Sequence, residues 1–228
     1  IEESGDGKLT QYTLTNSTLS SDALYTVYSD RNDNLWIGTY RHGIALFSPT
    51  LNYFRYATTD NGAISYSIVT AILPMGGNVM LGLDGGGIDI CSRDFTERRN
   101  LNAANSGLPG DNVISFAADG QRVWCAVYTK GLVCLNPADG SAVTYTIPEE
   151  MEHDNKLWTI ADDGKGNIWI GGTNLTVFRK ATGIFQPVEG AAGASVTSMA
   201  RQGGYMWVAT RHNGLLKYDT STMRAVQR

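Results

Sequence analysis

Three aspartates of this 228-residue chain, Asp30, Asp119 and Asp163, have side chains that could act in general acid and base catalysis. Each occupies the same place in a repeated segment, directly after its first apolar run. A short Asp side chain in such a place can accept hydrogen bonds from the backbone two residues further on and close a tight turn. Because the position repeats, we interpret these carboxylates as structural.

The rest of the sequence predicts no catalytic centre. Glycoside hydrolysis requires two carboxyl groups at a defined separation, and the spacing of Asp84, Glu149 and Asp154 identifies no such pair. Neither a His-Glu-x-x-His nor a Gly-x-Ser-x-Gly motif occurs, and the glycine-rich residues 82–87 and 164–166 lie in predicted hairpins rather than before a helix. We therefore expect no enzyme active site and no cofactor in this chain.

Cysteine and histidine chemistry is equally sparse. The three cysteines, Cys91, Cys125 and Cys134, are an odd number, and each stands where other repeats carry a hydrophobe, so we expect buried thiols. His42 and His212 fall in corresponding loops, but they would approach each other only if the first and last repeats met in a closed ring. We expect no metal site.

Residues that suit binding lie mainly in the loops that follow the second strand of each repeat. Variable loops on a rigid frame are a common place for binding groups, and an aromatic ring can lie on the apolar face of a sugar while polar neighbours bind its hydroxyl groups. The candidates are Tyr40, Arg41, His42, Tyr128, Lys130, Arg211 and His212, together with Trp158, the tryptophan outside the repeated position. The alternatives are ordinary solvated loop tips and, for Trp158, simple packing.

These loops are separated by a segment that returns five times. Its first copy reads Asn34-Leu35-Trp36-Ile37-Gly38-Thr39. The equivalent anchors are Trp36, Met80, Trp124, Trp169 and Trp207, separated by 44, 44, 45 and 38 residues. This period is typical of four-stranded propeller blades. The sequence therefore predicts an all-β protein, a β-propeller with about five four-stranded blades.

The composition agrees with a compact β protein and excludes two classes of partner. Hydrophobic residues make up 42% of the chain and charged residues 18%, and the 26 glycines suit short strands joined by tight turns. The formal net charge of −4 and the scattered basic residues argue against nucleic acid, which requires a clustered basic surface. Since no run of eighteen apolar residues occurs, we expect no membrane contact by this segment.

The first repeat predicts strands over Leu24–Asp30, Leu35–Thr39, Ile44–Ser48 and Tyr53–Ala57. The first strand of every repeat carries an apolar pair three residues apart, which we expect on opposite, buried faces. Each anchor is followed two residues later by a small residue such as Gly38, which would leave room for a bulky side chain of the adjoining blade.

Blade boundaries follow from the repeat. Residues 1–18, with an alternating run at 8–14, are interpreted as the outer strand of a preceding blade, and the five blades are expected at 19–62, 63–107, 108–151, 152–190 and 191–228. Both chain ends thus offer an outer strand. Either residues 9–14 close against the last blade in competition with its own end, or the chain is an arc of a larger ring. We favour the arc.

The repeated motif, an Asp or Asn turn, then Asn-Leu-Trp-Ile-Gly-Thr, then Gly-Ile/Leu-x-x-Phe/Tyr, resembles the two-component regulator propeller repeat. The best copies are residues 24–56, 113–145, 157–185 and 196–219; residues 69–95 match more weakly, with Met80 in place of Trp and Leu83 in place of Thr. The chain is most similar to the periplasmic sensor half of hybrid two-component receptors of polysaccharide-degrading bacteria. In that family two propellers, each of about seven blades, precede a β-sandwich domain, a membrane helix, and kinase and response-regulator parts.

This resemblance implies that the chain is a fragment of one propeller and that the kinase lies outside it. It implies an oligosaccharide ligand, the second propeller and the sandwich domain as partners, a homodimer formed through the parent receptor, and a periplasmic location as part of an inner-membrane receptor. The motif is a packing motif, so it assigns no ligand-contacting residue. A propeller lyase or hydrolase acting on a glycan and a protein-interaction scaffold remain the alternatives.

Overall fold

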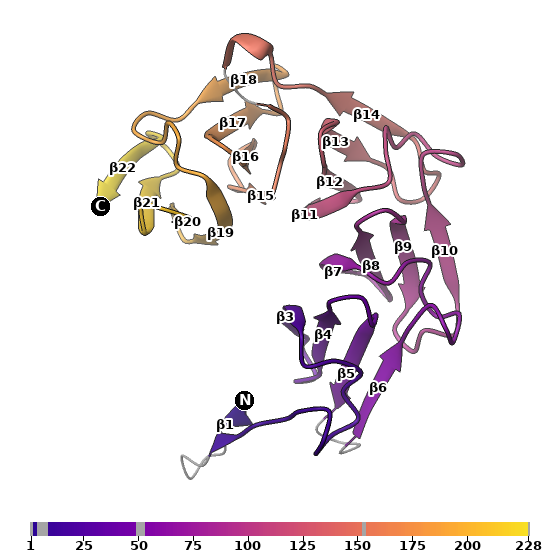
Figure 1. Ribbon diagram of the computed structural model, residues 1–228. Coiled ribbons are helices and arrows are strands. Elements are labelled where there is room, and N and C mark those ends of the chain that lie inside the picture. The colour runs from indigo at the N-terminus through magenta and orange to yellow at the C-terminus, as the bar shows by residue number, and fades with distance from the viewer. Residues whose placement is uncertain (1, 4–8, 49–52, 152–153, 228) are drawn as a thin grey trace. The chain divides into compact units, whose positions relative to one another are not determined.

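The computed structural model describes residues 2–3, 9–48, 53–151 and 154–227, and its regular structure is almost entirely β-strand (Figure 1). Within these residues the strands form five four-stranded antiparallel sheets, in each of which consecutive strands are neighbours. The prediction of an all-β propeller built of about five four-stranded blades is confirmed. No helix of the described residues is long and apolar enough to cross a membrane.

The strands divide evenly among the blades. Blade 1 consists of β3 (Leu24–Ser29), β4 (Leu35–Thr39), β5 (Ile44–Ser48) and β6 (Tyr53–Ala57). Blade 2 consists of β7 (Val69–Met75), β8 (Asn78–Leu83), β9 (Gly87–Ser92) and β10 (Arg98–Leu101). Blade 3 consists of β11 (Val113–Asp119), β12 (Arg122–Val127), β13 (Gly131–Leu135) and β14 (Ala142–Tyr145). Blade 4 consists of β15 (Thr159–Asp162), β16 (Asn167–Gly171), β17 (Leu175–Arg179) and β18 (Ile184–Pro187). Blade 5 consists of β19 (Val196–Gln202), β20 (Tyr205–Thr210), β21 (Leu215–Asp219) and β22 (Arg224–Gln227).

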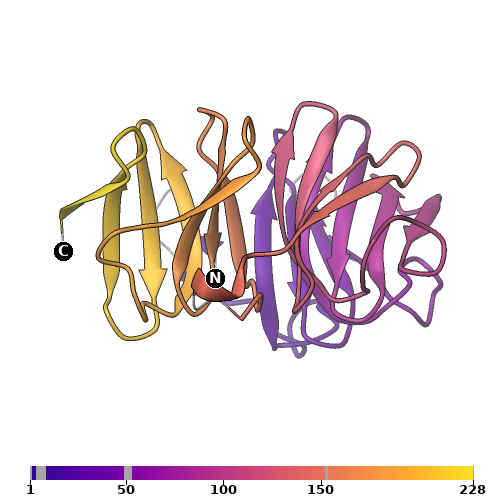
Figure 2. The same ribbon diagram turned by 90° about the horizontal axis from the view of Figure 1, so that it is seen from above.

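The chain divides into two compact units. Unit 1 consists of residues 1–85 and 89–100 and holds blade 1 and most of blade 2, whereas unit 2 consists of residues 86–88 and 101–228 and holds blades 3, 4 and 5. Within each unit the first strands of consecutive blades lie side by side, β3 with β7 in unit 1 and β15 with β11 and β19 in unit 2. Figure 2 shows that the strands of a blade run between the same two ends, so loops of one kind gather at one end of each blade.

In blades 1, 3 and 4 an aspartate stands at the turn after the first strand and accepts a hydrogen bond from the tryptophan of the second strand. The Oδ1 atom of Asp30 accepts hydrogen bonds from the backbone N–H groups of Asn32 and Asn34, and its Oδ2 atom accepts one from Trp36 Nε1 at 3.0 Å. Trp124 donates in the same way to Asp119 and Trp169 to Asp163, while Trp207 donates to Gln202. These contacts agree with the structural interpretation of the three aspartates. They also end β3 at Ser29, one residue earlier than predicted, because the Asp30 N–H donates within the turn to Asn34 O.

Each of these tryptophans in blades 1, 3 and 4 packs against the following blade. In unit 1, Trp36 lies in one core cluster with Val69 and Leu81 of blade 2. In unit 2, Trp169 lies in a cluster with Met206 and Val208 of blade 5. The small residue beside the ring makes this possible in blade 4, where a Cβ atom on Gly171 would lie 2.5 Å from Val196 Cγ1 of blade 5. The prediction that small residues make room for the adjoining blade is confirmed at Gly171, whereas a Cβ atom on Gly38 would crowd Thr26 Cγ2 of its own blade, at 2.7 Å, and only touch Val69 Cγ1 of blade 2, at 3.7 Å.

In blades 1, 2, 3 and 5 the apolar pair of the first strand does not lie on opposite faces, so that prediction is wrong for these blades. Leu24 pairs with Thr39 and Val27 with Ile37, because a β-bulge between Leu24 and Thr26 inserts one extra residue. Residues 37 and 39 of the partner strand share one face, so Leu24 and Val27 share it too. The same shift occurs in β7, β11 and β19.

Burial of this pair also differs between the blades. Leu24 is 52% exposed and Val27 is 65% exposed, whereas Val69, at the place of Leu24 in blade 2, is completely buried against blade 1. On the corresponding side of blade 1, Leu19 packs over Ile37 and Ala45 of the second and third strands. The prediction that both faces are buried is therefore wrong for blade 1.

The outer strand predicted over residues 8–14 is shorter in the structure. Leu9–Thr10 (β2) pairs with Glu2–Glu3 (β1), and residues 1 and 4–8 lie outside the described residues. From Thr13 onward the backbone turns, since Thr13 N–H donates to Asn16 Oδ1 at 2.7 Å and Leu14 N–H donates to Asp22 Oδ1 at 2.8 Å. These side-chain acceptors satisfy N–H groups that a strand partner would otherwise bind.

Candidate ligand-binding loops

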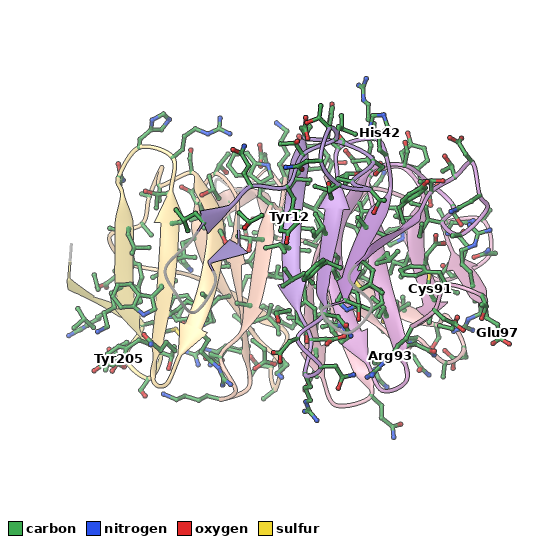
Figure 3. All side chains as sticks on the ribbon, turned by 90° about the horizontal axis from the view of Figure 1, so that it is seen from below. Tyr12, His42, Cys91, Arg93, Glu97 and Tyr205 are labelled. Carbon is green, nitrogen blue, oxygen red and sulfur yellow. The ribbon has the colours of Figure 1, made fainter. Side chains whose placement is uncertain are left out.

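The candidate loops stand at the end of each blade where the first strand begins. Their positions are fixed by a repeated backbone hydrogen bond from the residue that follows the second strand to the residue just before the first. Tyr40 N–H donates to Ala23 O at 2.8 Å, and equivalent bonds join Tyr128 to Asn112 and Arg211 to Ser195. Within unit 1, Figure 3 shows His42 at this end of the strands and Arg93 at the opposite end.

In unit 1, Tyr40 and Arg41 of the loop after β4 form a cluster with Tyr25 of β3. The rings of Tyr25 and Tyr40 are stacked, with centroids 6.4 Å apart and planes inclined by 14°. The guanidinium carbon of Arg41 lies 5.0 Å from the Tyr40 centroid, within cation–π range. Both tyrosine side chains are exposed. The structure thus brings together two predicted residues, Tyr40 and Arg41, and adds Tyr25, which the sequence places at the position of Trp158 but which was not predicted as a ligand residue.

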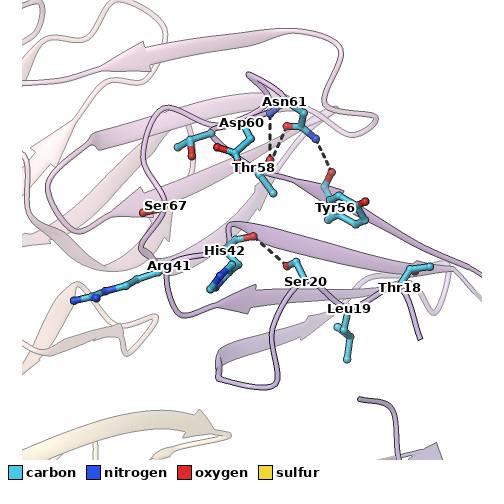
Figure 4. A pocket seen from close by; sticks show the side chains of 11 residues that line it. Thr18, Leu19, Ser20, Arg41, His42, Tyr56, Thr58, Asp60, Asn61 and Ser67 are labelled. Atoms are coloured by element: carbon cyan, nitrogen blue, oxygen red, sulfur yellow. Dashed lines mark hydrogen bonds between the residues drawn. The ribbon is translucent and has the colours of Figure 1, made fainter. Parts of the chain in front are cut away.

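A pocket of about 750 Å³ lies beside this cluster (Figure 4). The predicted residues Arg41 and His42 line it. Ser20 Oγ donates to His42 O at 3.1 Å, which ties this loop to the segment before blade 1. The other lining residues are Thr18, Leu19, Ser20, Tyr56, Thr58, Thr59, Asp60, Asn61 and Ser67. Its volume falls within the range of about 300–1,000 Å³ that small-molecule sites occupy.

The opposite wall of the pocket comes from the connection between blades 1 and 2. Asn61 shapes this connection, because its Nδ2 donates to Tyr56 O at 3.0 Å and its Oδ1 accepts from Thr58 N–H at 2.9 Å. The side chain of Tyr56 is 51% exposed and offers a ring, and Asp60 offers an exposed carboxylate. The bond from Thr58 N–H to Asn61 Oδ1 recurs in the equivalent segments, from Thr13 N–H to Asn16 Oδ1 and from Asn102 N–H to Asn105 Oδ1, but no residue of the connection between blades 1 and 2 was predicted as a ligand residue.

In unit 2 the structure brings together Trp158 and Arg211. The guanidinium carbon of Arg211 lies 5.5 Å from the centroid of the Trp158 ring. Trp158 is half-buried, and its backbone N–H donates to Gly171 O at 2.9 Å, whereas Arg211 and His212 are exposed. The two residues come from different blades, so the contact joins the loop ends of blades 4 and 5.

The remaining candidates of unit 2 belong to blade 3 and the segment after it. Tyr128 is half-buried and Lys130 is exposed. Lys156, which was not predicted, forms an ion pair with Asp154 at 2.9 Å. The hydrogen bond and the charge of Asp154 raise the pKa of Lys156, and the Tyr128 hydroxyl raises it by a smaller amount. Tyr128 follows β12 and Lys156 precedes β15, so both stand at the loop end of their blades in unit 2.

Acidic groups elsewhere are held in their ionised form. Lys180 donates to Asp119 at 2.9 Å and to Asp162 at 2.7 Å, and thereby joins the turns of blades 3 and 4. Hydrogen bonds from Trp124 and Lys180 lower the pKa of Asp119, and hydrogen bonds from Asn34 and Trp36 outweigh burial and lower the pKa of Asp30. A general acid requires a raised pKa, so these contacts do not suit that role.

Thiol and metal chemistry adds no further site among the described residues. All three cysteines are unpaired and buried, as predicted from their places in the repeat. Within the same residues, no group of three His, Cys, Asp or Glu side chains is arranged to hold a metal ion.

Comparison with known proteins supports the repeat and the architecture. Residues 18–41 match the family described as two component regulator propeller, which confirms the resemblance of the repeat. None of the curated proteins matches the chain in sequence. Among solved structures, the extracellular domain of BT3049 from B. thetaiotaomicron, described as part of a hybrid two component system, has a TM-score of 0.77 and 21% identity over 90% of this chain and 28% of its own.

Two further structures illustrate the range of proteins with this architecture. The extracellular domain of BT4673 from the same organism, also described as part of a hybrid two component system, has a TM-score of 0.75 and 22% identity over 92% of this chain and 30% of its own. Virginiamycin B lyase from Staphylococcus aureus has a TM-score of 0.70 and 15% identity over 93% of this chain and 70% of its own. At these identities the likeness is one of fold. The chain spans less than a third of the two extracellular domains.

Proposed function

We propose that this chain is part of the extracytoplasmic, periplasmic sensor propeller of a two-component receptor and that it recognises an oligosaccharide. The histidine kinase of such a receptor would lie outside the chain, and the segment itself would be non-catalytic. The family match at residues 18–41 and the architecture shared with extracellular domains of two-component systems support the class of protein.

One observation carries the choice of ligand. In unit 1, the exposed rings of Tyr25, Tyr40 and Tyr56 stand at or beside a 750 Å³ pocket that also offers polar groups from His42 and Asp60. Rings bind the C–H faces of a sugar, and the polar groups bind its hydroxyls. The site is built on loops held by repeated backbone hydrogen bonds, as expected for a binding site on a rigid frame.

The experiment is calorimetric titration of the whole chain with a panel of plant and host oligosaccharides, using matched variants. Tyr40→Ala and Arg41→Ala alter the cluster, and Arg93→Ala removes an exposed arginine at the opposite end of unit 1. We expect at least one oligosaccharide to bind and the two loop variants to weaken that binding about tenfold, the cost of losing one ring or one charged hydrogen bond. Arg93→Ala should leave the affinity unchanged.

Three results would contradict the proposal. The first is a folded chain that binds no member of the panel, and the second is equal weakening by Arg93→Ala and the loop variants. The third is release of a cleaved product during the titration, which would favour a lyase or hydrolase; the lyase of similar fold makes this a necessary control.

A further inference from the structure

From the cationic and aromatic side chains of unit 2, we propose that the loop end of this unit binds an acidic saccharide, whose carboxylate or sulfate group contacts Arg211. This inference rests on the proposed function and narrows its ligand class. It starts from three blades, which contribute Tyr128, Lys156, Trp158 and Arg211 to one end of the unit. We call these four residues the cationic strip.

Arg211 is held in place without having its charge neutralised. Its guanidinium lies over the Trp158 ring at 5.5 Å, and the Arg211 backbone N–H donates to Ser195 O at 2.9 Å. In the part of the chain that the structure describes, no carboxylate forms an ion pair with it. The guanidinium N–H groups of Arg211 can therefore bind an oxyanion.

The stacking also changes the role that Trp158 can have. A tryptophan near the loop end was predicted either to stack on a sugar or to fill space. With Arg211 over the ring, that face is covered, and the indole instead orients the cation. A side chain that is already oriented loses less conformational entropy when it binds. The pair therefore suits recognition of a fixed anionic substituent better than recognition of a bare pyranose face.

Charges around the strip favour an anion as well. Lys130 is exposed in the same loop as Tyr128, and Lys156 is exposed in the segment before blade 4. Asp154 pairs with Lys156, and Asp111 accepts a hydrogen bond from Ala103 N–H in the preceding connection. Glu150 lines a groove with Tyr145 and Ile184 of the outer strands, and thus belongs to the rim of the blades. Among the described residues, no carboxylate forms an ion pair with Lys130 or Arg211, so these two exposed cations are available to an anion.

The matched control lies in the same blade. Lys217 Nζ stands 4.1 Å from the Tyr205 centroid and 4.9 Å from the Trp207 centroid, so Lys217 is also a cation over aromatic rings. It lies in β21 rather than in the loops. Lys217→Gln removes a cation–π contact and one positive charge of blade 5, as Arg211→Gln does, but leaves the cationic strip intact.

The test is calorimetric titration of the whole chain and of both variants with four tetrasaccharide probes at low and moderate salt. Tetragalacturonate carries carboxylates, its methyl ester is the neutral counterpart, a carrageenan tetrasaccharide carries sulfates without carboxylates, and cellotetraose is neutral. We expect at least one acidic probe to bind more tightly than both neutral probes and to weaken with salt. Arg211→Gln should weaken that probe about tenfold or more, and Lys217→Gln less than about twofold.

The carboxylate and sulfate arms distinguish the two kinds of anion, and preference for either supports the inference. Equal or tighter binding of the neutral probes, or an unchanged affinity of Arg211→Gln for the acidic probes, would overturn it while leaving the sensor proposal in place. If neither these probes nor the wider oligosaccharide panel bind to the folded chain, both proposals fail together.

Discussion

The close approach of consecutive blades predicts a large effect from a very small substitution, Gly171→Ala. A Cβ atom at this position would lie 2.5 Å from Val196 Cγ1 of the next blade and 2.8 Å from Thr159 Cγ2 of its own. Both neighbours are buried, Val196 completely, so the added methyl group has nowhere to move. Overpacking of this kind costs about 1–3 kcal/mol.

The measurement is urea unfolding of the whole chain, with thermal unfolding as a second readout. For a chain of this size, each 1 kcal/mol lowers the unfolding midpoint by about 2–4 °C, so Gly171→Ala should unfold at a temperature lower by about 2–12 °C. Gly204→Ala is the matched control, because a Cβ atom there meets nothing within 4 Å. It should change the free energy of unfolding by less than about 0.5 kcal/mol.

A double variant separates crowding from a general intolerance of alanine. Val196→Ala creates a cavity on its own, but in combination with Gly171→Ala it removes Val196 Cγ1, the atom nearest to the new methyl group, while Val196 Cβ and Thr159 Cγ2 remain 2.8 Å away. The combined loss should therefore be smaller than the sum of the two single losses by about 0.5–3 kcal/mol. Equal stability of Gly171→Ala and Gly204→Ala, or strictly additive losses in the double variant, would refute the proposed blade packing.

Three further predictions concern other parts of the blades. Asp119→Asn should destabilise the chain at neutral pH, because it weakens the hydrogen bonds to Trp124 and Lys180. The folded-state pKa of Asp119 is lowered, so this stabilisation is present above the ordinary Asp pKa and is lost as the pH falls through the folded-state pKa. The urea midpoints of wild type and variant should therefore converge in acid, and an unchanged separation of the midpoints would contradict the lowered pKa. Burial raises the pKa of Cys91 to about 12, so a thiol reagent at pH 8 should label it only after unfolding, and rapid labelling of folded protein, mapped to Cys91 by mass spectrometry, would disprove that burial. Val27→Ala should cost less than about 0.5 kcal/mol because Val27 is exposed, whereas Val69→Ala should cost about 1–3 kcal/mol; equal losses in denaturant unfolding would contradict the assigned faces.

The sequence predicted the blades well because the anchor position repeats. Trp36 and its equivalents recur with fixed partners, the aspartate before and the small residue after, and each copy supports the assignment of the others. In blade 1 the bounds of all four strands were predicted to within one residue. Repetition in the sequence thus carried information on packing that a single blade would not have supplied.

The misassigned features depend on single residues rather than on the period. The bulge between Leu24 and Thr26 inserts one residue, which turns a three-residue spacing from opposite faces to the same face. The end of the predicted strand at 8–14 depends on two side-chain acceptors, Asn16 and Asp22, whose backbone partners are close only after the chain has turned. Neither feature changes the hydrophobic pattern.

The candidate site was predictable only in part. Loop position identified Tyr40, Arg41 and Arg211, because the loops of a repeat can be aligned. Tyr56, in β6, and Asp60, in the connection after it, were missed because the candidates came mainly from the loops that follow the second strand of each repeat. The contact between Arg211 and Trp158 joins residues 53 positions apart in different blades, and only the structure reveals which face of the ring is covered.

The most direct measurement of the sensor proposal is the thermal unfolding midpoint of the whole chain against the oligosaccharide panel. A ligand present at about a hundred times its Kd adds about 2.7 kcal/mol to the stability of the folded state, which corresponds to a rise of about 5–11 °C for a chain of this size. The account predicts such a rise for one class of saccharide and no rise when Tyr40 and Arg211 are both replaced by alanine. A cooperative transition whose midpoint no saccharide changes would contradict it.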